Sequence, residues 1–131
     1  MRLRSDVWVA ALVRSAFAGG ATAAVLRSGD EAAGAIFVSV DRLDGTGDLH
    51  GPAPQIDADE TSGERRFETV LARRPLDEIA ARIERERRFD SDLWWVEVAD
   101  RAGRCFIAPP PHDPAAPAPV RPAWPPKLDE F

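Results

Sequence analysis

The sequence predicts an α+β domain, a mainly antiparallel sheet of about five strands packed by two helices, followed by a proline-rich tail. Apolar residues repeat at helical spacing in two separate segments, and short runs of β-favouring residues lie between and after them. Nine of the twelve prolines fall from Pro109 onward. We therefore assign residues 1–107 to one domain and residues 108–131 to a Pro/Ala-rich tail that we expect to be disordered.

The first helix is expected over residues 6–18, where the apolar side chains fall on one broad arc. Ser5 or Asp6 can cap its start, and Gly19-Gly20 ends it because glycine adopts the left-handed conformation without steric cost. The opposite face is unusually bland, with alanine, serine and one arginine. We favour a solvent face there over a face covered by a partner.

Three β-rich runs follow, at residues 22–27, 35–43 and 47–50. Residues 28–34 are interpreted as a hairpin connection between the first two. Asp44-Gly45 predicts a tight hairpin turn, because both residues tolerate positive φ angles. The second and third strands should therefore be antiparallel neighbours.

A fourth strand is expected from Arg66 to the pair Arg73-Arg74, and Pro75 then opens the second helix. The run at residues 93–98 predicts a fifth, central strand, since both of its faces are apolar. Residues 104–107 are interpreted as a short edge strand. We expect both helices to pack on the same face of the sheet.

The net charge of −5 and the pI of about 5.0 count against a general polyanion binder, so a nucleic-acid partner is not expected. Residues 65–88 are locally basic, with eight arginines against five acids, which keeps RNA binding through this region as an alternative. Base stacking needs aromatic residues interleaved with the arginines, and the tryptophans belong to an apolar strand instead. A solvated, salt-bridged helix face is the preferred interpretation.

The expected location is the cytoplasm. A single cysteine, Cys105, cannot form an internal disulfide and suits a reducing compartment. The N-terminus imitates a secretory signal, but Asp6 and Arg14 interrupt its apolar run. No apolar run reaches the 18 or more residues of a membrane-spanning helix, so no membrane role is expected.

The glycine-rich stretch at residues 45–51 looks like a phosphate loop, but no helix follows to bind the phosphate, so we interpret it as a hairpin turn. Asp41, Asp44 and Asp48 invite a calcium-loop interpretation, yet the twelve-residue ligand pattern is absent. We interpret them as solvated turn residues.

No metal or cofactor is expected, because His50, His112 and Cys105 are too few to assemble a zinc site. His50 is a possible general base, although a turn residue is the better interpretation, and no catalytic residue is assigned.

Two sets of residues remain as candidate binding sites. Arg73 and Arg74 with Asp41 and Glu97 are weak candidates for a ligand site that combines arginines with acids. In the tail, partner docking is assigned to three apolar residues: Trp124, Leu128 and Phe131. The alternative for the tail is plain disorder.

Four blocks carry a resemblance to a known family: RLRSDVWVAALVR at residues 2–14, GAIFVSVDRLDG at 34–45, GPAP at 51–54 and RRFDSDLWWVEV at 87–98. They resemble an uncharacterised bacterial family, domain of unknown function family 1491. The resemblance covers roughly residues 2–107 and implies a small cytosolic protein of alphaproteobacterial type. It brings no activity, cofactor or catalytic residue, and it implies an aromatic residue where this chain has His50.

The leading hypothesis is a non-catalytic module that works through protein contacts, as a homodimer formed by the bland face of the first helix or by an open sheet edge. An enzyme is the less favoured class. The alternatives are a small enzyme or anionic-ligand binder using the arginine and acid candidates, and RNA binding through residues 65–88.

Overall fold

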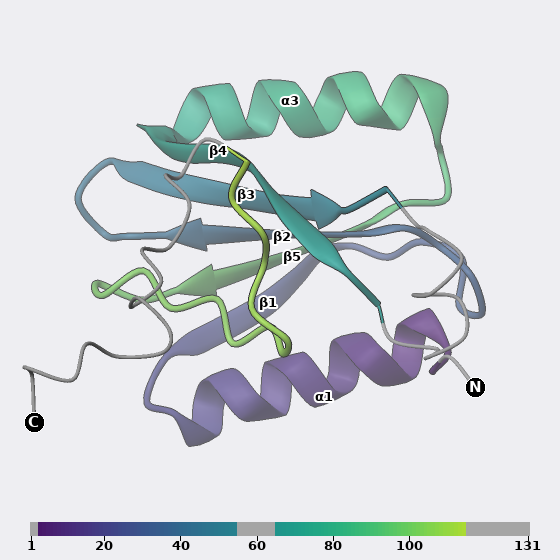
Figure 1. Ribbon diagram of the computed structural model, residues 1–131, viewed down its shortest axis with the longest axis horizontal. Coiled ribbons are helices and arrows are strands. Elements are labelled where there is room, and N and C mark those ends of the chain that lie inside the picture. The colour runs from purple at the N-terminus through teal and green to yellow at the C-terminus, as the bar shows by residue number, and fades with distance from the viewer. Residues whose placement is uncertain (1–2, 55–64, 115–131) are drawn as a thin grey trace, which may run out of the picture.

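The computed structural model describes residues 3–54 and 65–114. In chain order the elements are α1 (Ser5–Ala18), β1 (Thr22–Arg27), β2 (Ile36–Asp41), β3 (Thr46–Pro52), β4 (Phe67–Pro75), α3 (Leu76–Phe89) and β5 (Trp94–Ala99). Within the described residues the five strands form a sheet in the order β1-β5-β2-β3-β4, with one helix above it and one below it in Figure 1. The predicted α+β class and mainly antiparallel sheet are confirmed.

Strand pairing confirms two further predictions. β2 and β3 are antiparallel neighbours, with Ser39 opposite Leu49. β5 lies inside the sheet, antiparallel to β1 and parallel to β2. Its two apolar faces fit this interior place, because a strand covered on both sides excludes water from both rows of side chains.

The prediction that both helices pack on one face is wrong, since α1 and α3 cover opposite faces. One core joins α1 to the sheet and includes Val38 and Val96, whereas the other joins α3 to Phe37 and Leu93. Alternate residues of β2 and β5 thus enter different cores. Because these strands are apolar on both faces, each face requires its own covering helix.

The interpretation of residues 28–34 as a hairpin connection is also wrong, because β5 lies between β1 and β2. The segment instead crosses the start of β5. The backbone N–H of Asp30 donates to the carbonyl of Asp92 at 2.9 Å, and the indole N–H of Trp94 donates to the carbonyl of Asp30 at 2.8 Å. Gly29 contributes by having no Cβ, since a Cβ there would collide with the backbone of Asp92 and Leu93.

At the start of α1, the predicted side-chain cap is wrong. Arg4 occupies the N-cap position instead of Ser5 or Asp6, and no side-chain hydrogen bond caps the helix there. Ser5 is buried, and its hydroxyl donates to the carbonyl of Gly34 at 2.7 Å, which ties the helix to the crossing segment. At the other end the helix stops where predicted, with Gly20 at φ +88°.

The β2–β3 turn has positive φ at Leu43 and Gly45, not at Asp44. Asp44 serves the turn differently, because its carboxylate accepts hydrogen bonds from both the backbone N–H and the hydroxyl of Thr46. The turn is therefore fixed by a side-chain acceptor as well as by glycine.

Residues 104–107 form no strand, contrary to prediction. Ile107 is buried against the α1-side core, and the chain then reaches the outer edge of β4. There the N–H of His112 donates to the carbonyl of Phe67 at 2.9 Å, and the N–H of Thr69 donates back to His112 at 2.7 Å. One sheet edge, β4, is thereby partly covered, whereas β1 has no such neighbour within the described residues.

Candidate functional site

Two of the predicted ligand-site residues, Asp41 and Glu97, meet on the α3 side of the sheet. They line a hollow of about 150 Å³ beside α3, together with Ser39 and Trp95. The parallel register of β2 and β5 places Ser39 opposite Glu97, which brings the two carboxyl groups onto neighbouring strands. Burial, and secondarily the negative charge of Asp41, raise the pKa of Glu97.

The wall of this hollow is fixed by hydrogen bonds. The indole N–H of Trp95 donates to the hydroxyl of Ser39 at 2.8 Å, and the Asp41 carboxylate accepts from the backbone N–H of Leu43 at 2.8 Å. The hollow carries negative charge and therefore repels anions.

The structure does not bring the predicted arginines into this hollow. Arg74 is paired with Glu78 on the exposed start of α3, with N–O distances of 2.8 and 3.1 Å. Its neighbour Arg73 is exposed, and its backbone N–H donates to the carboxylate of Asp48 at 2.9 Å. Arginines and acids thus occupy separate places, and an anion site built from all four residues has no geometric basis.

The three aspartates considered for calcium point in different directions. Asp48 lies on the α1 side of β3, where its buried carboxylate pairs with Arg42 at 2.9 Å. Asp41 lies on the α3 side, and the Asp44 carboxylate accepts a hydrogen bond from the backbone N–H of Thr46 in the turn. Over residues 3–54 and 65–114, no group of three or more histidine, cysteine, aspartate or glutamate side chains is placed to hold a metal ion.

His50 and Cys105 lie in buried or half-buried positions without the arrangement that activates a base or a thiol. The Nδ1 atom of His50 lies 3.1 Å from the hydroxyl of Thr69, and burial lowers the pKa of His50. Burial raises the pKa of Cys105, which disfavours the reactive thiolate.

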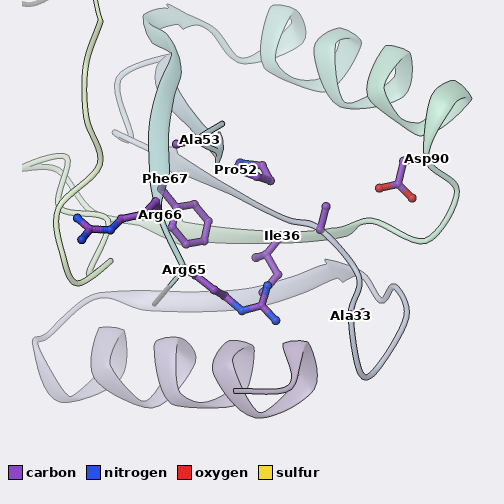
Figure 2. Close-up of a pocket in the computed structure, with 9 residues that line it drawn as sticks. Ala33, Ile36, Pro52, Ala53, Arg65, Arg66, Phe67 and Asp90 are labelled. Carbon is purple, nitrogen blue, oxygen red and sulfur yellow. The ribbon is translucent and has the colours of Figure 1, made fainter. Parts of the chain in front are cut away.

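A second hollow, of about 240 Å³, opens where β4 begins (Figure 2). Phe67 and Ile36 form its apolar wall, and Asp90 stands on the side away from Arg65. The guanidinium of Arg65 donates to the carbonyl of Leu3 at 2.9 Å and to the hydroxyl of Ser5 at 3.0 Å. These two hydrogen bonds connect the start of β4 to the start of α1.

Two exposed apolar surfaces were not predicted from the sequence. The first is the β1 edge. Val25 and Leu26 on β1 are 41% and 47% exposed, and Phe17 on α1 is 55% exposed. On the other side of α1, Trp8 stacks on Phe67 of β4 with ring centroids 4.9 Å apart. Phe17 follows Trp8 by nine residues, about 180° around the helix, so it lies on the flank of α1 away from β4.

The second such surface is the outer face of α3. Phe89, its last residue, is 90% exposed. Two shallow hollows flank this face, both lined by Arg82 and Arg85. No sequence pattern distinguished Phe89 from a core residue.

The docking residues assigned to the tail, Trp124, Leu128 and Phe131, lie outside the described residues. Of the tail predicted to be disordered, residues 108–131, positions 115–131 also lie outside the described residues, whereas His112 in the described part pairs with β4. Neither helix in the described ranges has the length and apolar character needed to cross a membrane.

These features define a small α+β domain with helices on both faces of a five-stranded sheet and exposed apolar residues at one sheet edge and one helix end. A family model described as "Protein of unknown function (DUF1491)" matches residues 3–108. The chain belongs to this family, which confirms the resemblance seen in the sequence.

Solved structures show the same fold. The solution structure of protein Atu0922 from A. tumefaciens is 52% identical, covering 86% of this chain and 99% of that one, with a TM-score of 0.72. A crystal structure of a DUF1491 family protein from Caulobacter crescentus is 41% identical with the same coverage and TM-score. An NMR structure of a DUF1491 family protein from the same organism is 40% identical, covering 86% and 97%, with a TM-score of 0.69. No curated protein matches the chain.

Proposed function

We propose that this protein is a protein-interaction module that assembles with a second copy of itself through the outer edge of β1. The observation that carries the proposal is the combination of an uncovered strand edge with the exposed apolar side chains of Val25 and Leu26. An exposed edge strand offers unpaired backbone N–H and C=O groups, and proteins usually protect such edges with charge, proline or a covering segment.

β1 has little of this protection. Its sequence, TAAVLR, contains one charged residue, Arg27, and no proline. The register shift lies between Val25 and Arg27, so the first part of the strand remains regular. β4 differs, because the segment at His112 covers part of its edge.

The occupant we favour is a second copy, because β1 is compatible with itself. In an antiparallel, fully overlapping pair, Arg27 lies opposite Thr22 of the partner subunit, so like charges do not face each other. A two-fold axis through the pair also brings the exposed Phe17 on the β1 flank of α1 toward its symmetry equivalent. The result would be one continuous sheet with an apolar contact between helices beneath it.

Sedimentation of the full chain over a concentration series tests the proposal. Wild type is expected to form a dimer, and the double variant Val25→Lys with Leu26→Lys is expected to dimerise about 100-fold more weakly or worse, because it places like charges in the contact. The matched control is Leu43→Lys, an exposed leucine in the β2–β3 turn, which should leave the dimer intact. A wild-type chain that sediments as a monomer throughout, or a double variant that dimerises normally, contradicts the proposal.

A further inference from the structure

We infer that the outer face of α3 is a docking site for residues 124–131 of the same chain. Docking on α3 does not depend on self-association through β1. The proposed self-association uses the β1 edge and α1, whereas α3 covers the opposite face of the sheet from α1. The docking face is defined by four residues: Arg82, Arg85, Arg88 and Phe89.

The C-terminal half of α3 is rich in arginine. Two of the arginines of α3 are paired along the helix, Arg82 with Glu86 at 2.9 Å and Arg87 with Glu84 at 3.2 Å. The side chains of Arg85 and Arg88 are exposed and make no hydrogen bond or ion pair with any other residue in the described ranges. This end of α3 therefore presents positive charge that no described residue neutralises.

Two hollows lie along this face of α3. One hollow, of about 510 Å³, lies between α3 and β4, with Leu71 and Ala81 among its lining residues. The other, of about 350 Å³, is lined by Arg82, Arg85, Glu86 and Phe89. Together they form a track along the helix, with an apolar contact at each end and the guanidinium groups of Arg82, Arg85 and Arg88 between. Three glutamates, Glu78, Glu84 and Glu86, also line the track, and each is already paired with another arginine: Arg74, Arg87 and Arg82, respectively.

Residues 128–131 carry a complementary pattern of side chains. The sequence LDEF at residues 128–131 places the adjacent acids Asp129 and Glu130 between two large apolar side chains. That order complements the track, since the acids can meet Arg85 and Arg88 while Leu128 and Phe131 contact apolar surface.

The last described residues lie near the hollow between α3 and β4. His112 pairs with β4 beside Phe67 and Thr69, two residues before Leu71, which lines the larger hollow. The chain therefore leaves the described fold beside the track. Leu128 lies fourteen positions after Pro114, a distance along the chain that can span up to about 46 Å, more than the roughly 21 Å length of α3. A tether this short gives a high effective concentration of the segment at the track.

Photocrosslinking of the full chain tests the inference. Phe131 is replaced by p-benzoylphenylalanine, the protein is irradiated at low concentration, and the crosslinked peptides are mapped by mass spectrometry. The expected crosslinks fall within residues 82–89. Reversal of charge in Arg85→Glu with Arg88→Glu should lower their yield about tenfold, because like charges then face the acids of the segment. Both arginines are exposed, so the fold should tolerate the change.

A control and a rescue make the result specific. Arg14→Glu with Arg101→Glu changes the net charge equally at exposed arginines elsewhere and should leave the yield unchanged. Asp129→Lys with Glu130→Lys should restore the crosslinks of the charge-reversed α3. Crosslinks concentrated outside α3, or a yield that charge reversal does not change, overturn the inference. In a mixture of isotopically labelled and unlabelled chains, crosslinks joining the two kinds would assign the segment to a second copy and overturn docking within one chain.

Discussion

Arg42 and Asp48 form a buried ion pair across the β2–β3 hairpin, with side chains that are 17% and 5% exposed. Both the Nε and a terminal nitrogen of Arg42 lie 2.9 Å from the same carboxylate oxygen. The other oxygen accepts the backbone N–H of Arg73, where β4 adopts a positive φ of 50°. One carboxylate thus joins the hairpin to the neighbouring strand, and its charge is neutralised where water does not reach it.

Replacing Asp48 is expected to destabilise the fold strongly. Asp48→Ala leaves the Arg42 guanidinium buried without its partner and should cost about 3–5 kcal/mol of unfolding free energy. Urea denaturation measures the loss. Asp44→Ala in the exposed turn is the matched control and should cost much less, so equal losses for the two variants would show that the buried pair has no special role.

Gly29→Ala should also destabilise the protein, because the new Cβ collides with the backbone of Asp92 and Leu93. The crossing segment would have to move away from β5, at a cost of about 1–3 kcal/mol. Thermal unfolding provides the measurement, and Ser28→Ala, one residue earlier and exposed, is the control. A Gly29→Ala protein as stable as wild type would mean that the segment does not pack closely on β5.

The contribution of Glu97 to the free energy of unfolding should decrease as pH rises. Burial first, and then the charge of Asp41, raise the pKa of Glu97 above its usual value of 4.5. The folded state keeps this proton where the unfolded chain has released it, so the contribution is full below pH 4.5 and is lost as pH rises through the folded pKa.

We therefore expect Glu97→Gln to be more stable than wild type near neutral pH, with a smaller loss on raising the pH from acid values. Denaturant titrations across this range test the expectation. Glu31→Gln, an exposed carboxylate that makes only a surface ion pair, should retain the wild-type profile.

The contribution of His50 to the free energy of unfolding should instead decrease as pH falls. Burial lowers its pKa below the usual 6.5, so the folded state favours the neutral ring. Its contribution is full above pH 6.5 and is lost as pH falls through the folded pKa, because the unfolded chain binds the proton first. His50→Gln cannot take up this proton and should lose less stability over the same acid range. His112→Gln, at an exposed histidine, serves as the control, and a His50→Gln profile identical to wild type would contradict the assignment.

Part of the candidate surfaces was predictable from sequence and part was not. Asp41 and Glu97 were paired as candidates, but only the parallel register of β2 and β5 brings them together. Arg74 was grouped with them, yet a local partner, Glu78, engages it four residues along the chain. Phe89 was assigned no role from the sequence, and only the fold shows it 90% exposed at the end of α3.

The sequence alone determined the features that depend on near neighbours: the extent of α1, its end at Gly20, the β2–β3 hairpin and the apolar character of both faces of β5. These follow from local backbone preferences and side-chain periodicity. Only the tertiary structure decided that β5 lies between β1 and β2, that the helices cover opposite faces, and that Ser5 bonds to Gly34 instead of capping its own helix. Periodicity shows that a face is apolar, but which element covers it depends on contacts between residues far apart in the chain.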